Sequence, residues 1–162
     1  MPDVRVEPWG PGNLALLQGL LGDPAMMAHL GGPDTEEKIA SRQLDYERPD
    51  SRQYRIVCDG EGAGWVGYWE REWRDREVFE IGWSVLPSFQ GRGLAGFATA
   101  AVLELARADA PGRDVHAFPS VDNAPSNAIC RKTGFELLGD VEFEYPKGSW
   151  LRCNDWRYRL PA

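Results

Sequence analysis

Short runs of apolar, β-branched and aromatic residues, several of them alternating with polar residues, predict strands along most of the chain. The predicted strands are Asp3–Glu7, Gln53–Cys58, Trp65–Trp73, Val78–Leu86, Val115–Phe118, Phe135–Phe143 and Leu151–Leu160. The sequence DGEGAG at 59–64 predicts a turn, and RDRE at 74–77 predicts the bend of a hairpin. Strands this numerous and this short indicate a sheet as the centre of the fold.

Other segments carry the pattern of helices with one buried face. The predicted helices are Asn13–Leu21, 34–48, Leu94–Ala108 and Ala124–Thr133. In the third helix the apolar residues recur at i, i+3 and i+4. We expect Asp34 or Thr35 to cap the second helix, Arg48 to lie in its last turn, and Gly134 to cap the fourth. The elements together predict a single α/β domain over 1–162, with a mixed, mainly antiparallel sheet flanked by helices.

A glycine-rich stretch, PSFQGRGLAG at 87–96, joins a predicted strand to a predicted helix. Glycines at this place let the backbone approach a phosphate, the helix dipole favours an anion, and Arg92 adds a cation. The stretch therefore predicts a pyrophosphate cradle. Two other interpretations stay open, a plain flexible turn and the G-x-G-x-x-G dinucleotide fingerprint, for which Asp114 lies near the expected distance. The fingerprint normally follows the first strand of its domain, whereas four predicted strands precede this glycine-rich stretch.

Composition narrows the class of protein. The net charge of −7 counts against a nucleic-acid partner and favours a cationic substrate, but it does not exclude a phosphate held by local donors. Three widely spaced cysteines (Cys58, Cys130 and Cys153) favour a reducing compartment and predict no zinc or other metal site. The sequence has neither an apolar run of the roughly 20 residues that span a bilayer nor a secretory signal. We therefore predict a cytoplasmic protein without a membrane partner, either monomer or homodimer.

Two motifs resemble those of the GCN5-related N-acetyltransferases (GNATs). Gln90-Gly91-Arg92-Gly93-Leu94-Ala95 is similar to the Q/R-x-x-G-x-G/A motif that holds the pyrophosphate of acetyl-CoA in that family. NAPSNAICRKTGF at 123–135 resembles the family's Asn-x-x-Ser segment, and EIGW at 80–83 resembles its central strand. The resemblance covers about 3–160 in element order and 78–137 in motif detail. It is strongest to the branch that acetylates ribosomal-protein N-termini.

The resemblance implies acetyl-CoA as co-substrate. It implies that the following residues bind acetyl-CoA: Val85, Leu86, Gln90, Gly91, Arg92, Gly93, Leu94, Ala95, Gly96, Asn123 and Ser126. It also implies that the pantetheine arm pairs with the backbone where the strand ends. A backbone N–H near Val85 would then polarise the thioester carbonyl.

Acetyl transfer to an amine needs a base for the ammonium and an acid for the leaving thiolate. Glu80 is the candidate base, because strand alternation places it beside the small residues Gly82 and Ser84. The alternative is an ion-paired glutamate on a strand face. Ser126 or Cys130 is the candidate acid; in many family members a tyrosine stands where this sequence has Cys130. The alternatives are a helix cap for Ser126 and a buried apolar role for Cys130.

Tryptophans are frequent, seven in 162 residues, and three of them lie two residues apart at Trp65, Trp69 and Trp73. One interpretation is a sheet face packed on helices. The other is an acceptor cleft for a cationic amine, formed with nearby Tyr68, Glu70 and Glu72. The two histidines, His29 and His116, lie far apart without an acidic partner pattern, so we expect both to be structural or exposed.

The sequence therefore predicts an N-acetyltransferase that moves an acetyl group from acetyl-CoA to a primary amine by direct attack. The acceptor is expected to be a small-molecule or peptide amine, cationic in character. A non-catalytic acyl-CoA-binding sensor of the same fold is the main alternative, because Cys130 replaces the usual tyrosine. A dinucleotide-binding oxidoreductase is the other.

Overall fold

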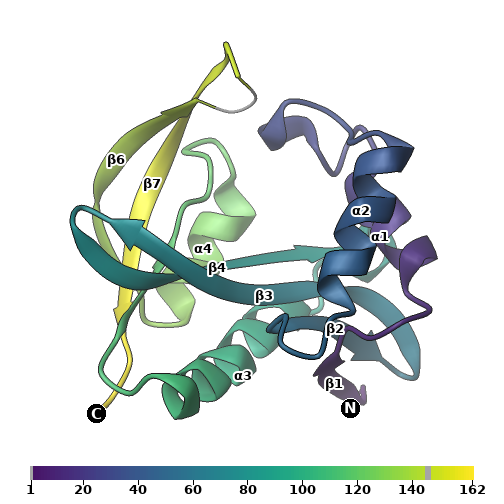
Figure 1. Cartoon of the computed structure of the whole chain (residues 1–162), viewed down its shortest axis with the longest axis horizontal. Coiled ribbons are helices and arrows are strands. Elements are labelled where there is room, and N and C mark those ends of the chain that lie inside the picture. Colours follow the sequence, from purple (N-terminus) through teal and green to yellow (C-terminus); the bar gives the residue numbers. More distant parts are fainter. Residues whose placement is uncertain (1, 145–146) are drawn as a thin grey trace. The chain divides into compact units, whose positions relative to one another are not determined.

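The computed structural model describes residues 2–144 and 147–162, and its strands and helices follow the predicted order (Figure 1). The elements are β1 (Val4–Pro8), α1 (Leu14–Leu21), η1 (Ala28–Leu30), α2 (Glu36–Tyr46), β2 (Gln53–Cys58), β3 (Glu61–Trp73), β4 (Arg76–Val85), η2 (Pro87–Phe89), α3 (Leu94–Asp109), β5 (Asp114–Ala117), α4 (Ala124–Lys132), β6 (Glu136–Glu144) and β7 (Trp150–Arg159). The two short 3₁₀ helices, η1 and η2, are absent from the sequence prediction.

The described strands form one hydrogen-bonded sheet in the order β1-β2-β3-β4-β5-β7-β6. β4 and β5 pair in parallel, whereas β1–β2, β2–β3, β5–β7 and β6–β7 pair antiparallel. Parallel neighbours need a crossover connection, and the loop after β4 together with α3 supplies it. The predicted fold class, a mixed and mainly antiparallel sheet with flanking helices, is confirmed.

The chain forms two compact units, one from Met1–Gly67 with Trp83–Ala98 and the other from Tyr68–Gly82 with Thr99–Ala162. β3, β4 and α3 each contribute residues to both units. None of the helices in the described residues is long and apolar enough to cross a membrane.

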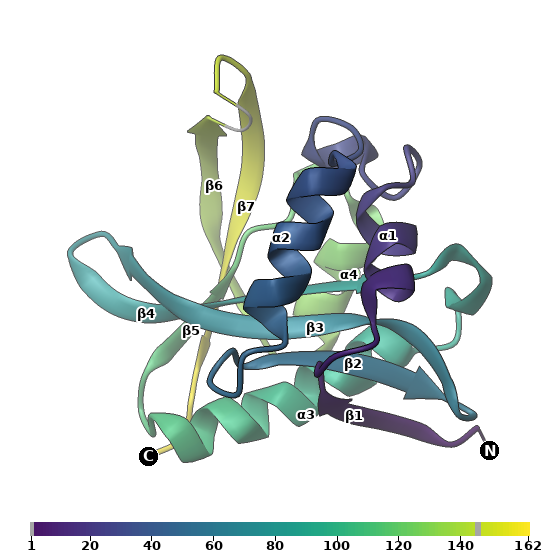
Figure 2. The same cartoon turned by 45° about the vertical axis from the view of Figure 1, so that its right-hand side comes forward.

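In the first unit, α1 and α2 lie side by side and enclose a small apolar core (Figure 2). Trp9 is buried with Leu17, Leu20 and Ile39, and its indole N–H donates to Gln43 Oε1 at 2.7 Å. Trp65 also packs on this layer, because its ring stacks on Tyr46 of α2 at 5.9 Å. For Trp65, therefore, the interpretation as a strand residue packed on a helix is confirmed.

Of the two expectations about the ends of α2, one is correct and the other is wrong. Thr35 is the N-cap, and its hydroxyl accepts from the Lys38 N–H at 3.2 Å. The helix ends at Tyr46, so Arg48 lies beyond it rather than in its last turn. Pro49 explains the difference, because a proline disfavours helical backbone at the residue before it.

The connection between β2 and β3 is shorter than the sequence suggested. The turn consists of Asp59 and Gly60, both at positive φ (51° and 83°), and β3 already begins at Glu61. Two such residues form the tight turn that suits a twisted hairpin. Gly64 resembles a turn residue in the sequence, but it lies inside the strand, where a Cβ would be 2.3 Å from the Ser84 carbonyl oxygen. This glycine therefore permits a close approach of backbones rather than a turn.

In the second unit, the β6–β7 hairpin lies beside α4 (Figure 1). α4 ends at Lys132, and Gly134, whose φ is 96°, lies just beyond the C-cap Thr133, as the predicted capping glycine. The Phe135 N–H donates to the Cys130 carbonyl at 3.0 Å. That bond and the left-handed glycine are the marks of a Schellman cap. The cap fixes where the chain leaves α4 and enters β6.

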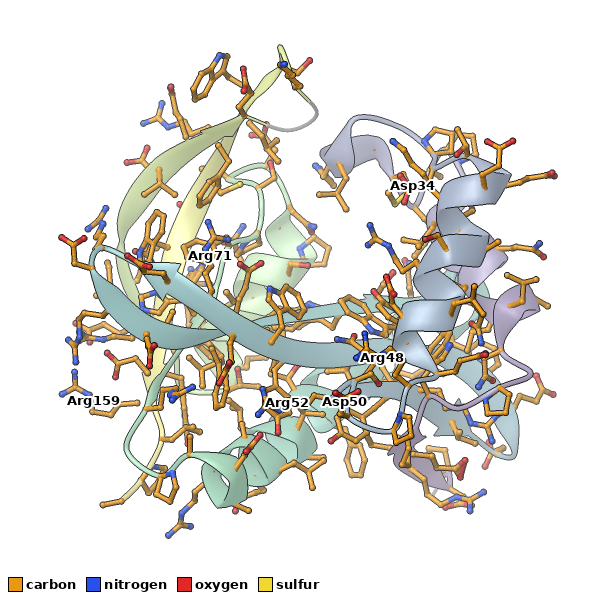
Figure 3. All side chains as sticks on the ribbon, viewed as in Figure 1. Asp34, Arg48, Asp50, Arg52, Arg71 and Arg159 are labelled. Atoms are coloured by element: carbon orange, nitrogen blue, oxygen red, sulfur yellow. The ribbon has the colours of Figure 1, made fainter. Side chains whose placement is uncertain are left out.

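An ion pair fastens β5 to β7 in this unit. Arg159, which is labelled in Figure 3, donates to both oxygens of the buried carboxylate of Asp114, at 2.8 and 3.4 Å. The hydrogen bond from Arg159 holds the pKa of Asp114 below its usual range, against the opposing effect of burial. The charged carboxylate is therefore favoured in the folded chain more than in the unfolded chain.

We expect Asp114→Asn to destabilise the protein at neutral pH but progressively less in acid. A depressed folded-state pKa contributes stability above the unfolded value of about 3.9, and this contribution is lost as pH falls through the folded value. Urea unfolding at pH 7, 5, 4, 3 and 2 measures the difference from wild type. Exposed Asp122→Asn is the control for general loss of a carboxylate. A difference at Asp114 that stays constant down to pH 2 would contradict the assignment.

Candidate functional site

The glycine-rich loop belongs to the first unit and leads from η2 into α3. Gly91 and Gly93 adopt positive φ (78° and 76°), which other residues rarely adopt without strain. A Cβ built on either would meet no atom within 4 Å. The glycines are therefore required by backbone conformation, and they leave open space in front of the loop.

Side chains of the loop hold its backbone in place. Gln90 Nε2 donates to the Val85 carbonyl at 2.9 Å, which ties the loop back to the end of β4. Arg92 donates to the Ser88 carbonyl at 3.1 Å, and its guanidinium lies 5.2 Å from the Phe89 ring centroid. The Phe97 N–H donates to the Gly93 carbonyl at 3.1 Å, so the helical bonding of α3 starts at that glycine. This is a helix N-terminus, whose dipole favours an anion, preceded by a shaped glycine loop.

Where β4 ends, the backbone is only partly available to a ligand. The Leu86 N–H donates to the Ala63 carbonyl at 2.9 Å, and the Val85 carbonyl already accepts from Gln90. The Leu86 N–H is therefore not available to polarise a thioester carbonyl unless its bond to Ala63 opens.

A hollow of about 320 Å³ lies beside the loop, within the first unit. Its lining consists of Cys58, Asp59, Glu61, Ser88, Phe89 and Arg92. Two carboxylates on its wall repel an anion, so this hollow is a poor phosphate site despite the arginine.

Glu80 lies on β4 in the second unit and is ion-paired with Arg71 of β3. Arg71 is labelled in Figure 3. Its side chain is 18% exposed. The sequence left open a free base and an ion-paired strand glutamate, and the structure contains the ion pair. A paired carboxylate still has lone pairs for a water molecule, so a role as base stays a prediction.

The Arg71 guanidinium lies over three aromatic rings. Its central carbon is 5.2, 4.9 and 5.0 Å from the ring centroids of Trp73, Phe118 and Phe143. The three rings also contact one another at centroid distances of 4.9 to 5.5 Å. Trp73 thus differs from Trp65: it packs in an aromatic cluster beside Glu80, not on a helix.

The Asn-x-x-Ser segment forms the start of α4. Asn123 is the N-cap, because its side-chain oxygen accepts from the Ser126 N–H at 3.2 Å. Ser126 itself is half-buried and is not the N-cap, so the interpretation of this serine as a helix cap is wrong. Buried Asn127 anchors the segment to β7: its amide oxygen accepts from Asn154 and from Trp156, both at 2.8 Å.

Cys130 is fully buried, with 0% of its surface exposed. Burial raises the pKa of its thiol to about 12. Such a thiol gives up its proton reluctantly, and it is closed off from a substrate. The interpretation of Cys130 as a buried apolar residue therefore fits the structure better than its interpretation as the acid.

The two histidines fit the expectation that each is structural or exposed: His29 is exposed and His116 is buried. The Nδ1 of His116 lies 2.6 Å from Asp155 Oδ1. The sequence pattern did not reveal this acidic partner. The two residues are 39 positions apart and meet because β5 pairs with β7. No spacing rule in the sequence marks such a pair.

In the part of the chain that the structure describes, no group of three or more His, Cys, Asp or Glu side chains is arranged to hold a metal ion. The expected absence of a metal remains a prediction.

Comparison with known proteins assigns the family. The family model described as "Acetyltransferase (GNAT) domain" matches residues 3–136. Comparison with curated protein sequences gives no match.

Solved structures of the same fold are numerous. A GNAT-family acetyltransferase from Bacillus anthracis superposes with a TM-score of 0.81 at 17% identity, covering 96% of this chain and 94% of that one. A Salmonella typhimurium acetyl transferase that modifies the N-terminal serine of ribosomal protein L7/L12 gives 0.76 at 22% identity, covering 97% and 95%. A second Salmonella typhimurium protein, solved with its cofactor acetyl-CoA, gives 0.75 at 18% identity, covering 100% and 95%.

The family model spans most of the chain, and these structures share its fold. The chain belongs to the GNAT family of acetyltransferases.

Proposed function

We propose that this chain is an acetyl-CoA-dependent N-acetyltransferase that acts as one domain over 1–162 and transfers the acetyl group to a primary amine by direct attack. The observation that carries the proposal is the glycine loop: Gly91 and Gly93 hold positive φ directly before α3, in a chain of the GNAT family. A loop of this shape suits a pyrophosphate, because it leaves room for the anion beside a helix N-terminus.

Backbone groups would contribute more to acetyl-CoA binding than charged side chains would. The proposed binding residues are Val85, Leu86, Gln90, Gly91, Arg92, Gly93, Leu94, Ala95, Gly96, Asn123 and Ser126. Gln90 supports this assignment, since its bond to the Val85 carbonyl couples the loop to the strand end that would carry the pantetheine. Arg92 is exposed and adds a mobile cation at the loop.

The chemistry would use Glu80 and Ser126. Glu80 would take the ammonium proton through water, and the amine nitrogen would then attack the thioester carbonyl. The C–N bond forms and the C–S bond breaks. The hydroxyl of Ser126 would protonate the CoA thiolate while it takes up the second proton that the nitrogen loses. The half-burial of Ser126 and the full burial of Cys130 favour the serine as the acid.

The acceptor is proposed to be a cationic amine. The net charge of −7 supports this proposal, because it attracts cations over a long range. The ribosomal-protein branch supports a peptide N-terminus as the first acceptor to try. The cytoplasm is the proposed compartment, with no nucleic acid or membrane as partner, and the chain is proposed to act as a monomer or homodimer.

The two alternatives predict different ligands. A sensor would bind acetyl-CoA without turnover, and an oxidoreductase would bind a dinucleotide. The dinucleotide alternative is weakened because the glycine loop follows the fourth strand of a mostly antiparallel sheet rather than the first strand of a parallel one.

We expect the purified protein to bind acetyl-CoA with a dissociation constant in the range of about 1–100 μM, and not to bind NADH, because the loop matches a pyrophosphate held at a helix N-terminus. Isothermal titration calorimetry with each ligand measures this. An acetylation screen over peptide N-termini, lysine, polyamines and an aminoglycoside follows. Binding without turnover of any amine would favour the sensor, and binding of NADH alone would overturn the proposal.

Replacement of a loop glycine should weaken acetyl-CoA binding more than it weakens folding. We expect Gly93→Ala to cost about 1 kcal/mol of folding stability through backbone strain and to reduce acetyl-CoA affinity at least about 10-fold. Gly112→Ala is the matched control, because Gly112 has the same positive φ (80°) and equally open space but lies after α3. It should lose similar stability and keep its affinity. Equal affinity in both variants would remove the loop from the binding site.

Loss of the candidate base should affect turnover and not acetyl-CoA binding. We expect Glu80→Gln to lower kcat by about 10²–10⁴-fold, because the amide still accepts a hydrogen bond from Arg71 but takes no proton. Glu77→Gln on the same strand, where the side chain is exposed, is the control. Steady-state kinetics with the best amine of the screen measure both. A Glu80→Gln enzyme with unchanged kcat and pH dependence would show that Glu80 is not the base.

A further inference from the structure

A buried histidine–carboxylate pair lies in the second unit, outside every role proposed so far. His116 on β5 is 4% exposed, and Asp155 on β7 is 1% exposed. His116 Nδ1 lies 2.6 Å from Asp155 Oδ1, and the Trp73 indole N–H donates to Asp155 Oδ2 at 3.1 Å. Both carboxylate oxygens are therefore engaged, and the imidazole is held in one orientation.

The pair determines which ring nitrogen carries the proton. Burial by itself would raise the pKa of Asp155, but the hydrogen bonds from His116 and Trp73 and the His116 charge hold it below its usual range. The carboxylate is thus ionised near neutral pH and accepts the hydrogen bond. Nδ1 of His116 then carries the hydrogen, and the lone pair lies on Nε2.

Nε2 can exchange protons although the residue is almost completely buried. The hydrogen bond of His116 uses Nδ1. Over residues 2–144 and 147–162, no buried side-chain nitrogen or oxygen lacks a hydrogen-bond partner. Nε2 is therefore in contact with solvent. The ring itself stacks on Phe118, at 5.7 Å between centroids and 15° between planes.

The sheet places His116 next to Glu80. In the parallel pairing of β4 with β5, Glu80 is the register partner of His116. Paired positions on adjacent strands, about 4.8 Å apart, project to the same face of the sheet. The candidate base and the imidazole therefore lie on neighbouring strands and on the same face.

Several other charged or titratable groups surround the imidazole. They are Arg71 and Arg74 of the β3 hairpin, Glu80 of β4, and Cys153, Asp155 and Arg157 of β7. Arg71 is paired with Glu80 and Arg157 with Glu136. Burial and the charge of Glu80 raise the pKa of the Cys153 thiol to about 11, so it stays protonated. Arg71 and Arg157, two of the charged groups near the His116–Asp155 pair, are therefore each balanced by an oppositely charged partner.

We propose that His116, oriented by Asp155, receives through Glu80 the proton that the acceptor amine loses. This inference depends on the proposed N-acetyltransferase function. The ammonium gives its proton to Glu80 through water, and the proton passes on to Nε2 of His116. The neutral amine then attacks the thioester carbonyl, the C–N bond forms and the C–S bond breaks. The second proton of the nitrogen passes to the leaving thiolate by way of Ser126, and the imidazolium releases its proton to solvent.

The acidities of the groups explain why two acceptors are needed. A free carboxyl group has a pKa of about 4.3, an imidazole about 6.5 and a lysine ammonium about 10.4. A carboxylate can pass on the ammonium proton but holds it poorly at neutral pH. An imidazole holds it better, because its free pKa is the higher of the two.

His116→Asn is the variant that tests the proposal. The asparagine amide nitrogen takes the place of Nδ1 and can still donate to Asp155, but nothing replaces Nε2 as a proton acceptor. We expect acetyl-CoA affinity to be unchanged and kcat to fall about 10²-fold. The acidic limb of the kcat–pH profile should differ from that of wild type, because Glu80 then has no imidazole to pass its proton to. His29→Asn, at an exposed position, is the control and should match wild type in rate and in profile.

A second measurement applies if His116→Asn does not fold. With only two histidines in the chain, the His29→Asn protein contains His116 alone. Its imidazole ¹⁵N shifts should show hydrogen on Nδ1, and diethyl pyrocarbonate should inactivate it reversibly with hydroxylamine. Hydrogen on Nε2, or full activity after His116 is modified, would overturn the inference.

Failure of the inference and failure of the proposed function give different results. If wild type acetylates an amine while His116→Asn keeps both rate and acidic limb, only the inference is overturned. If wild type neither binds acetyl-CoA nor acetylates any amine, the proposed function fails and the inference fails with it.

Discussion

The chemistry proposed for this protein depends on the parallel pairing of β4 with β5. Because parallel strands cannot be joined by a tight turn, the chain must leave β4, cross over and return to start β5. That crossover begins with the glycine loop and continues as α3. The same pairing sets Glu80 in register with His116. One topological constraint therefore accounts for both the glycine loop and the placement of Glu80 beside His116.

The second unit keeps charged side chains where apolar ones would be expected. Glu80 is paired with Arg71, Asp155 with His116, and Asp114 with Arg159. Buried charges need such partners, because an unpaired one costs several kcal/mol. A core of apolar residues would stabilise the folded chain without these ion pairs. In the proposed function Glu80 and His116 serve proton transfer, whereas the Asp114–Arg159 pair fastens β5 to β7.

Features set by neighbouring residues were predictable from the sequence. The glycine loop, the Thr35 cap and the Gly134 cap were all found where local pattern indicated them. Glycines inside a strand misled the prediction: Gly64 resembles a turn residue, yet it serves a close contact with the backbone of Ser84. Its role depends on Ser84, 20 positions further along the chain, which no local pattern contains.

By itself the sequence determined the elements, the phosphate-type loop and the resemblance to the family, because each depends on backbone preferences of residues adjacent in the chain. It also named Glu80 as a candidate, from strand alternation. Only the tertiary structure decided what Glu80 pairs with, that Cys130 is closed off by burial, and that His116 has a carboxylate partner. His116 and Asp155 are 39 positions apart and meet through strand register. Register is set by the packing of the whole sheet rather than by any short stretch of chain.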